Sequence, residues 1–352
     1  MLFRSGRLLT ARAATARRTL RPPATRTPTV SSSVLVVGSV ALDSVETPFG
    51  RADDALGGSA TYFAASASHH TRVQVVGVVG SDYPVDKLQA LASRGVDFAG
   101  LEHAEGESFR WRGRYRHDLN TAETLETRLG VFSHFRPKIP DQFRHAKYVF
   151  LGNIDPRLQL DVLRQVEKPK LVACDTMNFW IESRRADLLE LLGHVDLITL
   201  NDAEARQLSE HANLVKAARW IMAKGPRTVV IKKGEHGAFM FHADRVFFAP
   251  AYPLESVFDP TGAGDSFAGG FMGYLAHTDD LSEANLRRAV IFGSAMGSFV
   301  VEGFSIARLL EIRTADITRR VADFHRLVSF DAMLPRSEEH TSELQSHLNL
   351  VC

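Results

Sequence analysis

The fold is decided by the segment Phe258-Asp-Pro-Thr-Gly-Ala-Gly-Asp-Ser-Phe-Ala-Gly-Gly-Phe271. Asp259-Pro260-Thr261 is typical of a turn, Gly262-Ala263-Gly264 is a corner without large side chains, and a helix is expected from Asp265 to Leu275. A strand from Ala249 to Val257 is expected to lead into this corner. The first N–H groups of a helix are unpaired and carry partial positive charge, and small residues let an anion approach them. The corner is therefore a candidate anion site.

Asp265 is expected in the first turn of this helix, beside any anion that the corner binds. Phosphoryl transfer needs positive dipoles around the transferred group and a base that takes the proton of the attacking hydroxyl. The segment offers both. An acid in the first helical turn is also common without any function, because it interacts favourably with the helix dipole. Gly-x-Gly-Asp alone does not decide between these interpretations.

The complete segment resembles the C-terminal signature of the PfkB/ribokinase family of sugar and nucleoside kinases, D-[PT]-x-[GA]-[GA]-G-D-x-x-x-[GA]-[GA], at every position. The resemblance implies a ribokinase-like α/β fold, a three-layer α/β/α sandwich with a mainly parallel central sheet and a small β lid. It also implies an ATP-dependent kinase that phosphorylates an alcohol. Asp265 would be the base, and the N–H groups of Gly262, Ala263 and Gly264 would form the anion hole.

The composition is that of an ordinary soluble globular protein. The chain has 352 residues, of which 45% are hydrophobic and 24% charged, enough for one large α/β domain with an appendage. The formal net charge of +1 favours no nucleic-acid partner, and no apolar run reaches the roughly 20 residues that a membrane helix needs. Cys174 and Cys352, the two cysteines, are too few for a disulfide framework or a thiolate metal site, so a cytoplasmic location is expected.

The two ends of the sequence differ from the rest. Residues 1–33 contain many arginines and no acid, which predicts a disordered extension, with an organelle transit peptide as the alternative. Residues 331–352 are expected to be a disordered or non-native tail, since the part from Arg336 onward breaks with the preceding helical pattern. The kinase domain is therefore expected over residues 34–330.

Apolar runs alternate with helical segments along this domain. Such regular alternation predicts a parallel sheet covered by helices on both faces. Buried strands are expected at Val34–Gly38, Val73–Gly80, Tyr148–Leu151, Lys170–Cys174, Asp196–Leu200 and Arg227–Lys232, followed by a hairpin of Gly237–Phe241 and Arg245–Phe248.

Ser108–Arg116 alternates apolar and basic residues, the period of a strand with one wet face. We expect it to form a small sheet with Leu42–Pro48. The resemblance implies that this sheet is a lid over the substrate, built from about residues 42–56 and 106–130, through which two copies form a homodimer. The alternative is a row of arginines that is merely solvated.

Asp43 follows the first apolar strand, at the sheet edge where open α/β proteins bind ligands. The resemblance implies that Asp43 accepts hydrogen bonds from two sugar hydroxyls, a task that suits the lone pairs of a carboxylate, while Gly57 and Gly58 close on the acceptor. A solvated turn acid is the alternative. Two amides common in the family are absent, since Ala41 and Tyr62 stand in their places. The ring of Tyr62 either meets the substrate or fills the core.

Asn201-Asp-Ala-Glu204 follows a strand end and resembles the family's N-x-x-E motif. The resemblance implies that Asn201 lies beside the nucleotide and that Glu204 holds Mg²⁺ through water, and hard oxygen ligands suit that ion. The same residues fit a helix capping box, and both roles are compatible.

The turn after Arg227–Lys232 resembles a family turn beside the nucleotide, which makes Lys233 and Gly234 candidate nucleotide contacts, with Lys232 as the alternative lysine. A surface lysine pair is the competing interpretation. Thr261 and Gly264 are expected on the nucleotide side as well. Asp259 occupies a position where many family members bind K⁺.

Several functions remain open. No G-x-x-x-x-G-K-[ST] run is present, which disfavours a P-loop enzyme. The acceptor is expected to be a sugar or sugar-like molecule, and the alternatives are a nucleoside such as adenosine or cytidine, or a hydroxymethylpyrimidine. A non-catalytic nucleotide or metabolite sensor is the alternative from another class.

Overall fold

A computed structural model of the chain describes residues 32–329. The predicted N-terminal extension lies outside them except for Ser32 and Ser33, and the predicted tail 331–352 lies outside them entirely. The strands are β1 (Val34–Val37), β2 (Ala41–Thr47), β3 (Gly50–Gly57), β4 (Val73–Gly80), β5 (Val96–Ala104), β6 (Phe109–Tyr115), β7 (Ala122–Arg128), β8 (Tyr148–Leu151), β9 (Leu171–Asp175), β10 (Leu197–Asn201), β11 (Thr228–Lys232), β12 (Ala238–His242) and β13 (Arg245–Ala249). The helices are α1 (Ser59–Ala67), α2 (Gln89–Ala92), α3 (Pro156–Leu163), α4 (Asn178–Ser183), α5 (Arg185–Leu192), α6 (Asp202–Ser209), α7 (Leu214–Met222), α8 (Ala263–Thr278), α9 (Glu283–Val300), α10 (Ala307–Glu311) and α11 (Thr314–Val328).

Nine strands of the described chain form the large sheet, in the order β13-β12-β11-β10-β9-β8-β1-β4-β5. Neighbours run parallel from β11 to β5, and β12 and β13 are antiparallel. Both faces are buried, so the strand sequences are continuous apolar runs. In β1, Val34 and Val36 belong to one core, and Leu35 and Val37 belong to the other. The predicted, mainly parallel α/β sheet is confirmed.

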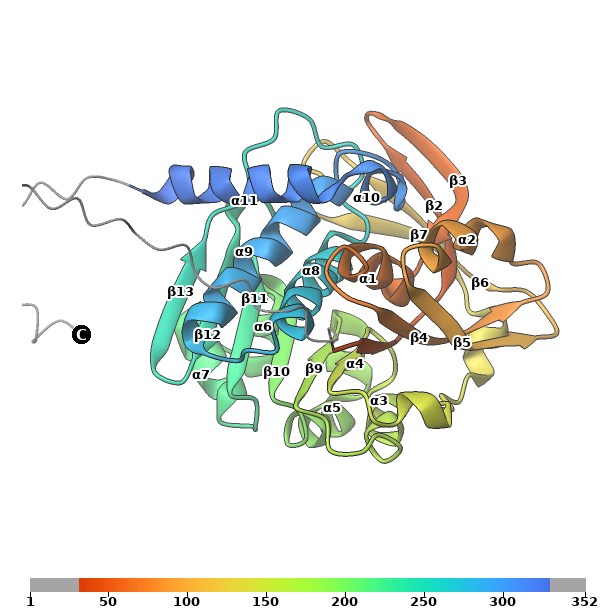
Figure 1. Ribbon diagram of the computed structural model, residues 1–352, viewed down its shortest axis with the longest axis horizontal. Helices are drawn as coiled ribbons and strands as arrows, with labels where there is room; N and C mark the ends of the chain where they lie inside the picture. Colours follow the sequence, from red (N-terminus) through yellow and green to blue (C-terminus); the bar gives the residue numbers. More distant parts are fainter. Residues whose placement is uncertain (1–31, 330–352) are drawn as a thin grey trace, which may run out of the picture. The chain divides into compact units, whose positions relative to one another are not determined.

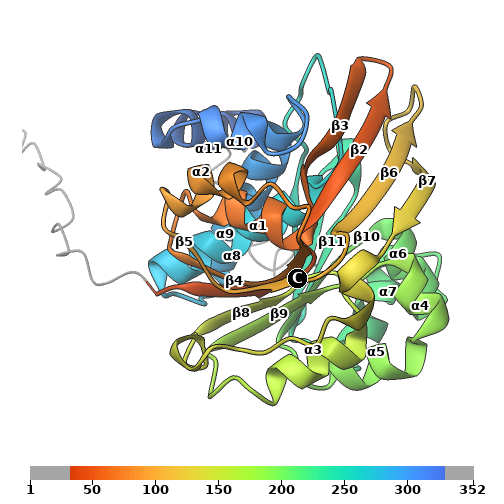
Figure 2. The ribbon, with the colours of Figure 1, turned by 90° about the vertical axis from the view of Figure 1, so that its right-hand side faces the viewer.

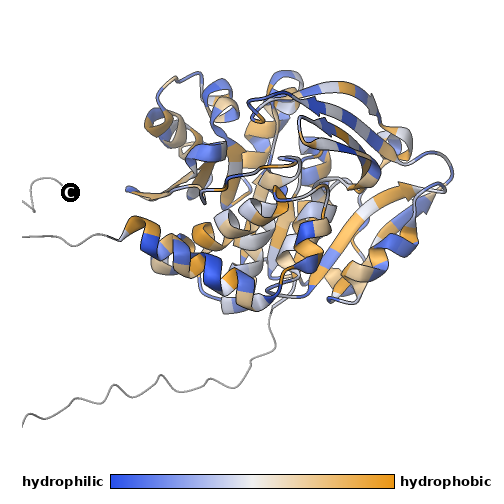
Figure 3. Ribbon diagram, turned by 90° about the horizontal axis from the view of Figure 1, so that it is seen from above, coloured by the Kyte–Doolittle hydropathy of each residue, from blue (hydrophilic) through white to orange (hydrophobic). Residues whose placement is uncertain are grey.

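Helices cover the sheet on both faces (Figure 1, Figure 2). Helices α1, α8, α9, α10 and α11 contribute to one core, and α3, α5, α6 and α7 contribute to the other. Helix α11 is amphipathic: Ile317 and Phe324 are buried, and hydrophilic residues lie between its hydrophobic ones (Figure 3). No helix within residues 32–329 has both the length and the apolarity needed to cross a bilayer.

Helix α8 lies at the centre of the first helical layer, against α1 and α9. Its glycines permit this close packing. A Cβ at Gly269 would lie 2.4 Å from the Phe63 carbonyl oxygen of α1, and one at Gly270 would lie 2.7 Å from Cγ of Met296 in α9. The small residues after the corner are therefore explained by helix packing, which holds the first turn of α8 in place.

The smaller sheet has the strand order β3-β2-β6-β7. Strand β2 pairs in parallel with β6, from Ala41 opposite Phe109 to Glu46 opposite Arg114. The predicted pairing of residues 42–48 with 108–116 is therefore confirmed. Strand β7 forms one edge of this sheet and is mostly exposed.

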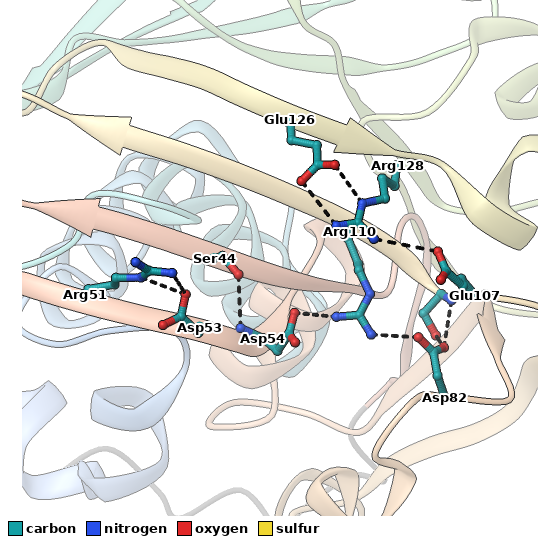
Figure 4. Close-up of polar contacts among 10 residues, drawn as sticks. Ser44, Arg51, Asp53, Asp54, Asp82, Glu107, Arg110, Glu126 and Arg128 are labelled. Atoms are coloured by element: carbon teal, nitrogen blue, oxygen red, sulfur yellow. Dashed lines mark hydrogen bonds and ion pairs between the residues drawn. The ribbon is translucent and has the colours of Figure 1, made fainter.

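Three of the arginines in Ser108–Arg116 are paired with acids. Arg110 bridges Asp54 of β3 and Asp82, with 2.7 Å between its Nη2 and the Asp82 carboxylate (Figure 4). Arg114 lies 3.2 Å from Glu46, and Arg116 lies 3.0 Å from Glu123. These three arginines are therefore ion-paired while Arg114 and Arg116 stay substantially exposed, and the lid role of the sheet stays a prediction.

The strand predicted over Ala249–Val257 is wrong. Strand β13 ends at Ala249, and residues 250–262 form an irregular segment that leads into α8. Pro250 and Pro253 explain the difference, because proline has no N–H to donate to a β-ladder. Helix α8 then begins at Ala263, slightly before the predicted start.

Candidate active site

The glycine corner, Gly262 to Gly264, forms the start of α8. Gly262 has a φ of +74°, in the left-handed region that favours glycine. A Cβ at Gly262 would lie 2.3 Å from the ring of Tyr62, and one at Gly264 would lie 2.9 Å from the ammonium nitrogen of Lys232. Glycine is therefore required at Gly262 for both backbone conformation and space, and at Gly264 it lets the lysine approach.

The corner presents N–H groups that have no partner in the protein. Ala263 N–H donates to the carbonyl of Pro260 at 3.2 Å and closes the turn. The N–H groups of Gly262, Gly264 and Asp265 have no acceptor within residues 32–329. Unpaired donors at a helix start are what an anion binds. The free donors thus differ from the predicted set, since Asp265 takes the place of Ala263.

Asp265 lies in the first turn of α8 and is partly exposed. Burial of its carboxyl group raises its pKa to about 7, the negative charge of Asp175 raises the pKa further, and Lys232 lowers it. A carboxylate with a pKa near neutrality is a better proton acceptor than an ordinary aspartate. The position and the pKa of Asp265 both suit a general base.

Asp43 in β2 is buried, with its carboxyl group against Gly57, where a Cβ would lie 2.1 Å away. Burial raises the pKa of Asp43 to about 7, the Gly58 N–H lowers it, and the charges of Asp259 and Asp265 raise it. The fold therefore brings Asp43 close to Asp265, although more than two hundred positions separate them in the sequence.

Tyr62 of α1 packs against the glycine corner from the protein core. The side chain is 1% exposed, and its ring packs against Gly262. Its hydroxyl is buried and has no hydrogen-bond partner among the described residues. A buried hydroxyl without a partner is costly. The ring occupies the core, one of the two expectations for Tyr62, and its contact with a substrate stays a prediction.

Asp259 and Thr261 fix the turn before the corner. Asp259 is buried, and its carboxylate accepts hydrogen bonds from the N–H of Thr261 at 2.9 Å and of Ser305 at 3.4 Å. The Thr261 hydroxyl donates to the hydroxyl of Tyr115, at the end of β6, at 3.3 Å. The smaller sheet therefore touches the glycine corner. Tyr115 was not predicted as a site residue, because its only signal is an aromatic side chain in an alternating strand.

Asn201 and Glu204 form a capping box at the start of α6. The Glu204 N–H donates to Asn201 Oδ1 at 2.8 Å, and the Asn201 N–H donates to Glu204 Oε2 at 2.7 Å. Burial raises the pKa of Glu204 to about 7, Asp175 raises it, and Lys232 lowers it. The capping role is confirmed, and the other carboxylate oxygen of Glu204 makes no hydrogen bond within residues 32–329.

Asp175 and Lys232 form an ion pair beside the corner. Lys232 Nζ lies 2.8 Å from Asp175 Oδ2, and both side chains are largely buried. Asp175 was not predicted. Its only sequence signal is its position at the end of a buried strand. Lys233, the lysine favoured from the sequence, instead places its ammonium 5.6 Å from the centre of the Phe239 ring.

Gly234 lies against the loop that joins β6 to β7. Its φ is +53°, and a Cβ there would lie 2.9 Å from Oδ1 of Asn120. Asn120 also donates weakly to Glu235, at 3.5 Å. The turn after β11 therefore meets the smaller sheet, and contact of Lys233 and Gly234 with a nucleotide stays a prediction.

Comparison with known families agrees with this geometry. The family described as pfkB family carbohydrate kinase matches residues 34–312. The chain belongs to the pfkB family. It is therefore an ATP-dependent kinase with an alcohol as the acceptor, and the predicted family, fold and enzyme class are confirmed.

Relatives of this pfkB kinase include named nucleoside kinases. The cytidine kinase of Thermococcus kodakarensis is 33% identical over 257 residues, which cover 71% of this chain and 91% of the relative. A nucleoside kinase of Methanocaldococcus jannaschii is 27% identical over 173 residues, which cover 49% of this chain and 54% of the relative.

Solved structures share the fold. The structure of the Methanocaldococcus jannaschii nucleoside kinase matches with a TM-score of 0.67 at 20% identity and covers 83% of this chain and 98% of that one. The Salmonella enterica aminoimidazole riboside kinase, solved with aminoimidazole riboside and an ATP analogue, matches with a TM-score of 0.66 at 21% identity and covers 82% and 99%.

Kinases of the pfkB family use ATP and a divalent metal. Within residues 32–329, no group of three or more His, Cys, Asp or Glu side chains converges as a ready-made metal cage. The donors beside the corner are carboxylates, which are hard oxygen ligands. Such a site fits a hydrated cation that takes most of its ligands from phosphates and water.

Proposed function

We propose that this pfkB kinase phosphorylates the hydroxymethyl group on the ribose of a nucleoside. One observation carries the proposal. Asp265, a carboxylate with its pKa raised to about 7, adjoins the unpaired N–H groups of Gly262 and Gly264. A base and an anion site therefore adjoin at one helix start, which is the arrangement that phosphoryl transfer to a hydroxyl requires.

The proposed step uses Asp265 as the proton acceptor. The oxygen of the substrate hydroxyl forms a bond to the γ-phosphorus of ATP, and the bond from that phosphorus to the bridging oxygen breaks. The hydroxyl proton passes to Asp265, and ADP leaves. The N–H groups of the corner stabilise the charge on the transferring group.

Two observations favour a nucleoside acceptor. The cytidine kinase relative covers most of this chain, and the amides expected of a ribokinase-type sugar site are replaced by Ala41 and Tyr62. Asp43 would accept hydrogen bonds from the ribose hydroxyls, since it lies close to Asp265. Gly57 and Gly58 would close on the same sugar.

A free sugar is the second candidate. The same carboxylate and the same base serve any sugar with a hydroxymethyl group, and ribokinases of Haemophilus influenzae and Staphylococcus aureus share shorter stretches with this chain.

The metal of this kinase is proposed to be Mg²⁺, held by Glu204 through water beside the ATP phosphates. The basis is the free carboxylate oxygen of Glu204 and the preference of Mg²⁺ for oxygen and water ligands. Asp259 is proposed to bind K⁺. Its carboxylate also accepts two backbone hydrogen bonds, so it would bind the ion and stabilise the turn at the same time.

We also propose a homodimer through the smaller sheet. Its strand β7 is an exposed edge, and the side chains around it carry both charge signs. An exposed edge strand is a natural surface for pairing with a second copy.

A panel of acceptors tests the function. ADP release would be measured with cytidine, adenosine, ribose, fructose 6-phosphate, 2-keto-3-deoxygluconate and hydroxymethylpyrimidine, each with MgATP. The highest kcat/KM is expected for a nucleoside. A higher value for a free sugar or for the pyrimidine would replace the nucleoside, and no turnover with any acceptor would favour a sensor.

A further inference from the structure

The ion pair of Asp175 and Lys232 spans three neighbouring strands of the large sheet. Asp175 ends β9, Lys232 ends β11, and Thr199 of β10 lies between them and donates its hydroxyl to Asp175 Oδ2 at 2.6 Å. The other oxygen, Oδ1, accepts the N–H of Thr176 at 2.7 Å. Asp175 is therefore fixed on both oxygens, and it holds the lysine ammonium at 2.8 Å.

Stability does not explain this pair. Removing two charges from water costs about as much as their attraction returns, so a buried ion pair adds little stability over apolar side chains of similar size. The side chains of Lys232 and Asp175 are only 17% and 7% exposed, so this cost applies here. The position of the pair suggests another reason for it, since it lies at the carboxyl edge of parallel strands, where ligands bind.

The ammonium also lies against the glycine corner. A Cβ at Gly264 would be 2.9 Å from Lys232 Nζ, so a side chain at this position would displace the ammonium. Lysine has three N–H donors, and one of them is used by Asp175. The other two have no acceptor within residues 32–329, and the ammonium lies close to Gly264, whose own N–H is unpaired.

The charges around the lysine keep it protonated. Burial lowers the pKa of Lys232, but Asp175 and Glu204 raise it, and the net result is a raised pKa. Asp265 acts in the same direction. Asp175 pairs with the ammonium directly, and Glu204 and Asp265 act on it electrostatically. The ammonium is therefore a positive charge beside the corner that would hold a phosphate.

We propose that Lys232 binds the γ-phosphate of ATP, with Asp175 and Thr199 as the anchor that positions its ammonium beside the glycine corner. This inference rests on the proposed kinase function and adds a cationic phosphate contact to it. The unused donors of Lys232 and the free N–H groups of the corner would then hold the same phosphate. Neighbouring Lys233 has no such position, since its ammonium lies over the Phe239 ring.

Direct binding and turnover test the role of Lys232. The variants are Lys232→Met, Lys232→Arg, and, as a control with the same change of side chain, Lys216→Met at an exposed lysine of α7. Binding of ADP and of a non-hydrolysable ATP analogue would be measured by calorimetry with Mg²⁺ present, and kcat with the best acceptor. Thermal melting would confirm that each variant is folded.

We expect Lys232→Met to lower kcat on the order of 10² to 10³, as the loss of one donor to transition-state charge does. It should weaken binding of the ATP analogue more than binding of ADP, which lacks the γ-phosphate. Lys232→Arg should recover part of the loss because it keeps the charge. Lys216→Met should stay within about threefold of the unmodified protein.

The inference is overturned if Lys232→Met keeps normal turnover, or if it weakens ADP and the analogue equally, which would indicate a structural role. Failure of the proposed function is a separate result. If the unmodified protein phosphorylates no acceptor, the comparison of ADP with the analogue still decides whether Lys232 contacts the γ-phosphate.

Discussion

Asp265 is the residue on which the chemistry depends. Its carboxylate adjoins the anion site, and asparagine would keep its size but could not take up a proton. We expect Asp265→Asn to lower kcat on the order of 10² to 10⁴ while ATP-analogue binding and the melting temperature stay close to normal. The measurement is steady-state turnover with calorimetry on the same preparation. Asp244→Asn, in the exposed turn between β12 and β13, is the control. Near-normal turnover of Asp265→Asn would remove it from the role of base.

The pH dependence of the reaction follows from the same residue. A base acts only when it is deprotonated, and the pKa of Asp265 is raised to about 7 in the free protein. We therefore expect kcat/KM to rise with pH up to about 7, rather than to level off near pH 4 as it would for an ordinary aspartate. Asp43 and Glu204 also have pKa values of about 7, so the rise should involve more than one proton. A kcat/KM that is flat from pH 5 to 8 would contradict this expectation.

The same raised pKa values predict how stability changes with pH. Between the unfolded value near 4 and the folded value near 7, the folded protein binds more protons than the unfolded one at these carboxyl groups. Their contribution to the free energy of unfolding must therefore fall as pH rises through this window. Denaturant titrations of the unmodified protein and of Asp265→Asn at pH 5 and pH 8 would measure it. The asparagine variant should lose less stability over this interval, and an equal or greater loss would contradict the assignment.

At the scale of elements, the start of α8 depends on glycine. Alanine at position 262 would place a side chain in the left-handed region, at a cost of about 1 to 2 kcal/mol, and its Cβ would meet the Tyr62 ring. We expect Gly262→Ala to lower both the melting temperature and kcat, because the first turn of α8 must move. The control is Gly303→Ala, where the nearest atom is 3.6 Å from the added Cβ and the backbone is ordinary. Equal behaviour of the two variants would show that the corner tolerates a side chain.

The sequence predicted those features that contiguous residues encode. The parallel strands followed from apolar runs, and the corner followed from one segment in which the turn, glycines and acid are neighbours. The strand predicted over Ala249–Val257 is wrong because Pro250 and Pro253 interrupt a segment that otherwise resembles an apolar strand. Asp175 was missed for a different reason. Its partner Lys232 lies two strands away in the sheet. The residues around Asp175 in the sequence do not indicate which strand ends become neighbours in the folded sheet.

At the scale of the whole domain, the smaller sheet connects both sides of the site. Tyr115 at the end of β6 bonds to Thr261 before the corner, and Asn120 in the next loop touches Gly234 after β11. Asp43 in β2 puts this sheet on the expected acceptor side, and both contacts join it to residues expected on the nucleotide side. Such contacts are compatible with the lid that the family resemblance implied, and that role stays a prediction.

The outer charges of this sheet also bear on the proposed dimer. They line a hollow of about 330 Å³ with four arginines and four acids: Arg51, Arg110, Arg112, Arg128, Asp53, Asp54, Glu107 and Glu126. Several of them pair within the chain (Figure 4). Arg112 is exposed and has no ion-pair partner among the described residues. A surface with balanced charges can match itself across a two-fold axis, where each positive group meets an acid of the second copy.

We therefore expect light scattering to give twice the chain mass of 38.9 kDa at low salt. The dimer should weaken as ionic strength rises from about 0.15 to 1 M, because the screening length falls from about 8 to 3 Å. Arg112→Glu replaces the unpaired positive charge with a negative one beside the acids of the hollow, so it should shift the protein toward the monomer. Arg164→Glu, at the exposed residue directly after α3, is the control and should remain dimeric. A monomer at every salt concentration, or a dimer that Arg112→Glu leaves intact, would place the pairing surface elsewhere or remove it.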